Sequence, residues 1–228
     1  MSREGPSMNL HRILGIFLAI QLGMALSAFG QGSYKTEAIG AAPADVPAPL
    51  QSTLETSGVR VAGDGGATLC EVWLRKALPT TASPNTSSDV LYGALTEGAL
   101  LGVLHFPKDT PDFRSQTIKA GFYTLRYALI PQDGNHVGVS PNRDAFVLSP
   151  VAADKDPDKT LSFEDLVKLS QQASGTPHPG FLLGAPVNGD TFPAVAKDDS
   201  GHWNLQLKGH GKSGEAPLAF TVVGKWEG

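Results

Sequence analysis

The side chains best suited to chemistry gather in one polar stretch of the chain. His136 lies between two carboxylates, Asp133 and Asp144, and His105 adds a fourth candidate at the end of an apolar run. Imidazole nitrogen and carboxylate oxygen are ligands that zinc, iron and manganese accept. One interpretation is therefore a site for a divalent metal ion, in a carrier or a metal-dependent enzyme. No other cofactor is suggested by the sequence.

The same stretch also suits direct contact with another molecule. The residues expected to form this contact surface are polar and lie in or beside one loop: Asp133, Asn135, His136, Asn142, Arg143, Asp144 and Arg126. Two guanidinium groups could hold a carboxylate or sugar acid through paired hydrogen bonds. The partner would be a protein, a carbohydrate or a small polar ligand. The purely structural alternative is that the carboxylates serve turn geometry and form ion pairs with the arginines.

Motifs for covalent catalysis are weak. Ser140 supplies, with His136 and Asp144, the residue types of a serine triad, but a proline follows it and prevents the helix of a nucleophile elbow. Cys70 is the single cysteine and falls within a predicted strand, which favours a buried, inert thiol. The run from 209 to 214 lacks the first glycine of a phosphate loop and precedes a strand. We therefore expect a protein that acts by binding, with no catalysis.

Alternating side chains predict the strands that hold this polar loop. From Gly121 to Ile130, Tyr123 and Leu125 fall on one face, whereas Thr124 and Arg126 fall on the other. Proline then ends the run, because it cannot donate to a strand ladder. A short apolar segment, 145–148, returns after the loop. Bulk on both faces of the first strand predicts a central position in a packed sheet.

The rest of the chain repeats this pattern. Eight to ten short apolar runs are separated by turns, and the chain contains 26 glycines and 17 prolines. One segment, Leu161 to Ala173, has helical periodicity, with Ser162 as N-cap and Asp165 three residues later. These features predict an all-β protein: an antiparallel β-sandwich, immunoglobulin-like or jelly-roll-like, with one short packed helix.

The first 30 residues have the composition of a secretory signal peptide. Basic Arg3 and Arg12 precede an apolar run, and small Ala28 and Gly30 fit cleavage before residue 31. Met8 is an alternative start. The Ala/Pro-rich residues 31–49 are predicted to be a linker, and residues 50–228 a single sandwich domain. We expect a secreted or periplasmic protein without stable membrane insertion in its mature form.

Charge and composition limit the classes of partner that we expect for this protein. The formal net charge is −4 and no basic cluster is present, which argues against nucleic acid and anionic membrane surfaces as partners. All three methionines precede residue 31, so the mature chain offers no thioether for copper. A third hypothesis is an envelope protein that self-associates through an exposed strand edge.

Three motifs carry a resemblance to a known family. They are Ala-Gly-x-Tyr-x-Leu-Arg-Tyr at 120–127, Asp-Gly-x-His-x-Gly at 133–138 and Ser-Pro-x-Arg-Asp at 140–144. In these motifs the chain resembles a family of secreted bacterial β-sandwich proteins of unknown function. The first motif is also similar to a second bacterial domain predicted to be a β-sandwich. The resemblance, which extends over about 59–224, implies the fold and the location but no activity, cofactor or partner.

Overall fold

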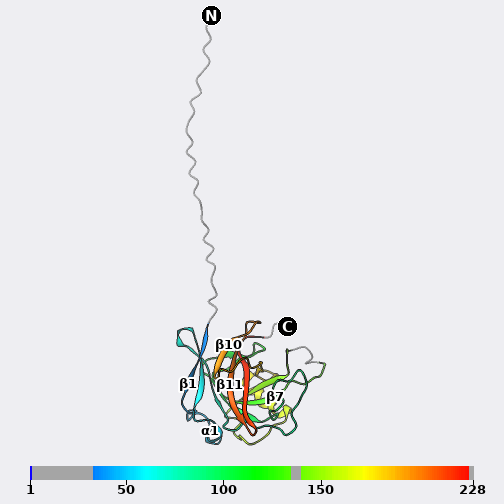
Figure 1. Ribbon diagram of the computed structural model, residues 1–228. Helices are drawn as coiled ribbons and strands as arrows, with labels where there is room; N and C mark the ends of the chain where they lie inside the picture. Colours follow the sequence, from blue (N-terminus) through cyan, green and yellow to red (C-terminus); the bar gives the residue numbers. More distant parts are fainter. Residues whose placement is uncertain (2–32, 135–139, 226–228) are drawn as a thin grey trace. The chain divides into compact units, whose positions relative to one another are not determined.

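The computed structural model describes residues 1, 33–134 and 140–225. The chain divides into two units, Met1–Gln31 and Gly32–Gly228, and every element below belongs to the second (Figure 1). The signal-peptide prediction falls on residues outside the described part, apart from Met1. Among the described residues, no helix has the length and apolar character needed to cross a membrane.

Two antiparallel sheets dominate the second unit. The larger sheet has seven strands in the order β1-β2-β3-β4-β7-β8-β9, namely Tyr34–Ile39, Gly58–Gly63, Thr68–Leu74, Leu100–Phe106, Gly121–Leu129, Asp144–Pro150 and Phe181–Leu183. The smaller sheet has the order β10-β11-β12, namely Ala194–Lys197, Trp203–Gly211 and Gly214–Val223. The remaining elements are α1 (Ala48–Thr53), α2 (Phe163–Ser174), the 3-10 turn η1 (Asp64–Gly66) and the paired strands β5 (Thr110–Pro111) and β6 (Thr117–Ile118).

The prediction of an all-β, antiparallel, sandwich-like fold is confirmed. The larger sheet curls, so that both of its edges approach the smaller one. At one edge the Thr36 hydroxyl donates to the carbonyl of Pro193, just before β10; at the other, Gly184 after β9 forms a bridge with Phe220 of β12. Strands of the larger sheet follow one another in chain order. This is a meander, and it differs from the Greek-key order that the expected immunoglobulin-like or jelly-roll-like topology requires.

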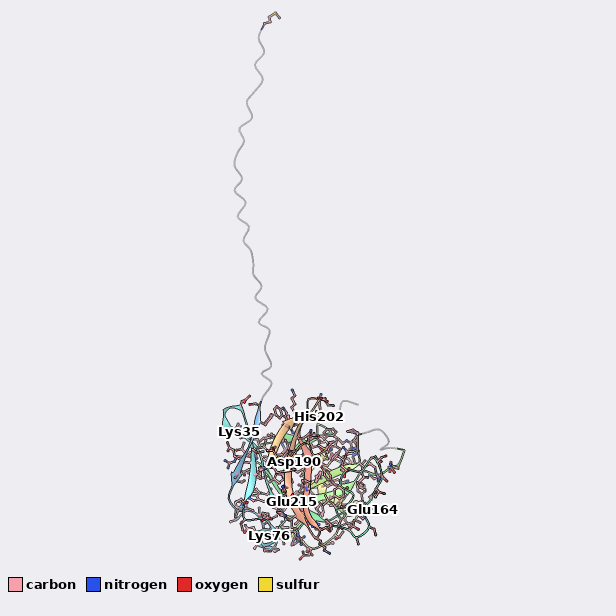
Figure 2. The ribbon with its side chains drawn as sticks, viewed as in Figure 1. Lys35, Lys76, Glu164, Asp190, His202 and Glu215 are labelled. Carbon is pink, nitrogen blue, oxygen red and sulfur yellow. The ribbon has the colours of Figure 1, made fainter. Side chains whose placement is uncertain are left out.

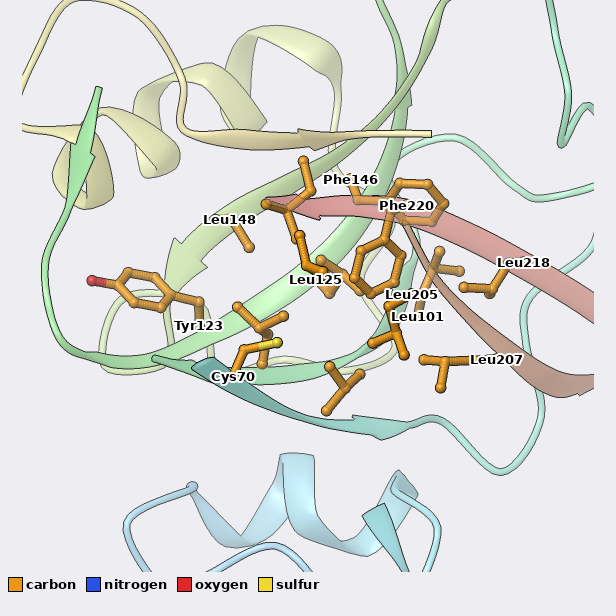
Figure 3. Close-up of a cluster of buried hydrophobic side chains, with 14 of the residues drawn as sticks. Cys70, Leu101, Tyr123, Leu125, Phe146, Leu148, Leu205, Leu207, Leu218 and Phe220 are labelled. Atoms are coloured by element: carbon orange, nitrogen blue, oxygen red, sulfur yellow. The ribbon is translucent and has the colours of Figure 1, made fainter. Parts of the chain in front are cut away.

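The main core lies between the two sheets (Figure 3). Leu125, Phe146 and Leu148 of the larger sheet meet Leu205 and Phe220 of the smaller one, and each is no more than 1% exposed. The predicted alternation of β7 is confirmed: its tyrosines and leucines enter this core, whereas the intervening side chains face the opposite side of the sheet. Burial of this apolar surface is the main force that holds the two sheets together.

The two helices cover the outer face of the larger sheet. At the start of α2 the Ser162 hydroxyl accepts a hydrogen bond from Asp165 N at 3.2 Å, as the capping pattern predicts, and Gly175 ends the helix with a positive φ of 65°. Leu166 of α2 packs with Val147 of β8 in a second apolar cluster. The shorter helix α1 places Leu50 in a third cluster, around Trp73 of β3.

The predicted linker, residues 31–49, is wrong for its described part. Tyr34–Ile39 pairs along its whole length with β2, and the Trp73 indole donates to the carbonyl of Gly40 at 2.8 Å. Val46 is 1% exposed. The alanine- and proline-rich composition suggested a spacer, but β-sheet pairing depends on a partner strand that composition does not reveal. The domain therefore begins well before residue 50.

Candidate functional site

The polar loop that sequence analysis singled out is described only in part. Asn135 and His136 lie outside the described residues, so the roles predicted for them stay predictions. Asp133 is exposed at the start of the loop. The Ser140 hydroxyl, the candidate nucleophile, donates to the main-chain carbonyl of Asn142. Elemental analysis of the purified protein and of a His136→Ala variant tests whether a metal binds at this loop.

Asp144 anchors the base of this loop and is fully buried. Its carboxylate accepts hydrogen bonds from the backbone N–H groups of Leu91 and Tyr92, at 2.7 and 2.9 Å, and from the Tyr127 hydroxyl at 2.7 Å. Burial, together with the negative charge of Asp144, raises the pKa of the Tyr127 hydroxyl well above its ordinary value, so this hydroxyl stays protonated and donates. Asp144 fixes the 91–92 segment to the sheet, which is a structural role.

The other described members of the predicted contact surface also bond within the protein. The Asn142 side chain donates to the carbonyl of Gly184 at 2.9 Å and accepts from Asp144 N at 3.0 Å. Nε of Arg143 donates to the carbonyl of Ile130 at 2.8 Å, which closes the base of the loop. The ion pair predicted between Asp144 and either Arg143 or Arg126 is not seen: Arg143 donates to backbone, and Arg126 pairs with a different carboxylate, that of Asp154.

Arg126 lies on the outer face of the sheet, away from this loop, and is 0% exposed. Its Nε and Nη2 bond to the two carboxylate oxygens of Asp154, at 2.6 and 2.9 Å. The remaining N–H groups donate to the carbonyls of Gly98, Lys159 and Asp156. All five guanidinium N–H groups are thereby used. The structure thus corrects the expectation that Arg126 faces the loop and leaves it no donor for a ligand.

His105 also lies far from the carboxylates with which it was grouped. It pairs with Phe122 near the start of β7, whereas Asp144 pairs with Leu129 at the other end of that strand. Seven residues of strand separate the two positions, or about 23 Å at the usual rise. His105 instead stacks on Phe122 and contacts Glu71, with 2.9 Å between Nδ1 and Oε2. The described residues contain no group of three metal-binding side chains.

A different feature, a pocket of about 420 Å³, lies between the two sheets. We call it the inter-sheet pocket. Its apolar wall is made by Val59, Val72, Leu74, Phe192, Pro193 and Leu207. Polar side chains line it as well: Glu55, Ser57, Asp190, Lys208 and His210. Strands β2 and β3 supply one wall, and β11 with the approach to β10 supplies the other.

The charged side chains that line the inter-sheet pocket differ in whether another protein side chain neutralises them. Nζ of Lys208 lies 3.0 Å from the carboxylate of Glu215 and 5.3 Å from the centre of the Phe192 ring. The side chains of Glu55 and Asp190 form no hydrogen bond or ion pair within the described part of the chain. Figure 2 shows Asp190 and Glu215 on the side of the molecule that carries β10 and β11. Two acidic residues therefore line the pocket without a counter-charge from the residues that the structure describes.

Sequence analysis missed the inter-sheet pocket. Its residues come from four separate segments, and no two of its charged side chains form a motif. Only the packing of one sheet on the other places Glu55, before β2, around the same pocket as Lys208 and Asp190. The alternation of apolar and polar residues in β11 was visible, but such alternation marks any strand with one buried face.

The chain was compared with protein-family models, with curated proteins and with solved structures, and no match was found in any of the three.

Proposed function

We propose that this chain is an exported, non-catalytic binding protein that holds a small ligand in the inter-sheet pocket. The observation that carries this proposal is the pocket itself. Its volume of about 420 Å³ falls in the range of small-molecule sites, which combine apolar walls with a few polar groups. Val72, Leu74 and Leu207 give it a floor that belongs to the main core, so this floor is built on strands, whereas Glu55 and Asp190 come from the loops beside them.

Binding without catalysis is supported by how the candidate catalytic groups are used. The carboxylate of Asp144 already accepts three hydrogen bonds, and the Ser140 hydroxyl is engaged by backbone. Cys70 is 0% exposed, and burial raises its pKa to about 12, which keeps the thiol protonated at neutral pH. The pocket brings together charges and apolar surface, which suit recognition.

Export is supported by the order of features before residue 31. Basic residues, an apolar run and small residues at Ala28 and Gly30 follow one another as in a signal peptide. Expression of the full chain in a secreting bacterial host should give a processed product in the periplasm or medium. N-terminal sequencing should find Gln31 at or near its start; an unprocessed chain in the cytoplasm would contradict export.

A compound screen tests the binding function. The chain from residue 32 is mixed with a library of small metabolites, and its thermal midpoint is measured. A ligand at 100 times its Kd stabilises the native state by about 2.7 kcal/mol, which is a shift of several degrees. The matched variant is Val59→Trp, which puts an indole on the half-buried pocket wall. Hits should shift the wild type and leave Val59→Trp unchanged.

Val90→Trp is the control for that substitution. Val90 is also half-buried and packs against the main core, but it does not line the inter-sheet pocket. This variant should keep the thermal response of the wild type. If no compound shifts the wild type, or if Val59→Trp responds as the wild type does, the pocket is not the binding site.

A further inference from the structure

We propose that the inter-sheet pocket selects ligands that carry a protonated amine on an apolar body. This inference rests on the proposed function and goes beyond it, since it names the chemical class of the ligand. It depends on the balance of charge in the pocket, on the nature of its floor and on the engagement of its one ammonium group. Each of these is a property of described residues.

The charge in the pocket is negative. Two acidic residues, Glu55 and Asp190, line it without a counter-ion among the described residues, whereas the ammonium group of Lys208 is held 3.0 Å from Glu215. A ligand cation would therefore meet two unneutralised carboxylates. A ligand anion would be repelled by both, and it would have to replace Glu215 to reach Lys208. Even when solvent partly screens it, the attraction between opposite charges near a protein surface favours the ligand cation over the anion.

The backbone at Glu55 is fixed against the larger sheet. Glu55 N donates to the carbonyl of Leu74 at 2.8 Å, and the preceding residue, Leu54, forms a bridge with Arg75. Leu54 is 2% exposed. The Glu55 side chain therefore extends from a fixed point of the backbone at the side of the pocket. Binding of a ligand cation therefore has to order the Glu55 side chain but not its backbone, which limits the entropic cost.

The floor of the pocket is apolar and deep in the fold. Val72, Leu74 and Leu207 are 1%, 8% and 3% exposed and belong to the main core. The Phe192 ring faces an ammonium group already, since Nζ of Lys208 lies 5.3 Å from its centre. An alkyl chain or aromatic ring would be buried against this floor while its amine stays near the carboxylates. A fully polar cation would leave the apolar wall unused.

Three matched probes test this inference by isothermal titration calorimetry on the chain from residue 32. 4-Phenylbutylamine, 4-phenylbutanol and 5-phenylpentanoate share one phenylbutyl body and differ in the charge of the head group. We expect the amine to bind at least about tenfold more tightly than the alcohol, and the carboxylate to bind most weakly. The preference for the amine should shrink as salt rises, because the interacting charges are partly exposed.

Variants assign the preference to the two carboxylates. Glu55→Gln and Asp190→Asn should each weaken amine binding several-fold and leave alcohol binding unchanged. Glu164→Gln is the matched control: Glu164 is exposed on α2 and does not line the pocket, so this change should have no effect on any probe. Val59→Trp should weaken the binding of all three probes.

The outcomes separate this inference from the proposed function. Equal binding of amine and alcohol, lost in Val59→Trp, overturns the charge preference and leaves the binding function standing. Tighter binding of the carboxylate, or no binding of any probe, also overturns the inference. The binding function fails only if the wider compound screen finds no ligand that depends on the pocket.

Discussion

At the scale of single residues, the most consequential contact is the buried pair Arg126–Asp154. Removal of the carboxylate leaves an uncompensated charge that is 0% exposed. We therefore expect Asp154→Ala to lower the free energy of unfolding by about 3–5 kcal/mol, the usual cost of breaking a buried ion pair. Urea denaturation of the chain from residue 32, followed by circular dichroism, measures this loss.

An exposed aspartate of the same segment gives the control. Asp158 also bonds to an arginine, Arg75, at 2.6 Å, but its side chain is 77% exposed. Asp158→Ala should lower the free energy of unfolding by less than about 1 kcal/mol, because solvent screens the pair. Equal losses of unfolding free energy in Asp154→Ala and Asp158→Ala would show that the burial of Arg126 does not determine the size of the loss.

Cys70 gives a second prediction at this scale. Its side chain is 0% exposed and its pKa is raised to about 12 by burial, with a smaller contribution from the charge of Glu71. The thiol should therefore not react with Ellman's reagent at pH 8 while the protein is folded, and should react in full in denaturant. Fast labelling of the native chain would contradict the burial of β3 in the core.

At the scale of elements, a row of side chains crosses β1, β2, β3 and β4 on the outer face of the larger sheet. Glu37, Arg60, Glu71 and His105 follow one another in register, and Arg60 Nη2 lies 2.8 Å from Glu71. Burial raises the pKa of Glu71, but hydrogen bonds from His105 and Arg60 outweigh it, and the pKa lies below its ordinary value of 4.5.

The sign of this shift fixes a pH dependence. A carboxyl group with a lowered folded-state pKa stabilises the protein above pH 4.5 and loses that contribution as pH falls through the folded pKa. At pH 7, Glu71→Gln should reduce the free energy of unfolding by about 1–2 kcal/mol, and the difference from wild type should shrink below pH 4.5. Exposed Glu97→Gln serves as control, with a small effect at both pH values. A difference that stays constant with pH would contradict the linkage.

At the scale of the whole molecule, the fold depends on its first strand. β1 pairs with β2 over its full length, and the ring of Tyr34 lies 5.1 Å from that of Trp203 in the smaller sheet. A chain that starts at residue 50 would lose this strand and the buried Val46, and it would expose the edge of β2. We expect it to aggregate or to melt well below a chain that starts at residue 32. Size-exclusion chromatography and thermal melts of the two chains, prepared in parallel, decide this.

If both chains are equally stable monomers, residues 33–49 are dispensable and the sheet does not need its first strand.

The chain that starts at residue 32 also serves to test self-association, the third hypothesis from the sequence. β1 lies beside the approach to β10, and β9 continues into a bridge with β12, so both edge strands of the larger sheet are partly covered. Covered edges resist pairing between chains, and light scattering should report a monomer.

The local features of this protein could be predicted from its sequence. The two-residue period of β7 assigned Tyr123 and Leu125 to one face and Arg126 to the other, because side chains alternate along any strand. The cap at Ser162 and the stop at Gly175 bounded α2, because a capping hydrogen bond and a positive φ need only neighbouring residues. Fold class followed from the number and spacing of such elements.

Only the tertiary structure decided which residues meet. Asp154, rather than Asp144, pairs with Arg126, because the segment after β8 folds back over the outer face of the sheet. The antiparallel register of β4 and β7 put His105 and the polar loop at opposite ends. The inter-sheet pocket joins Glu55 and Asp190 across a long stretch of chain. Such contacts depend on sheet register and on how the two sheets stack, and no local sequence pattern specifies either.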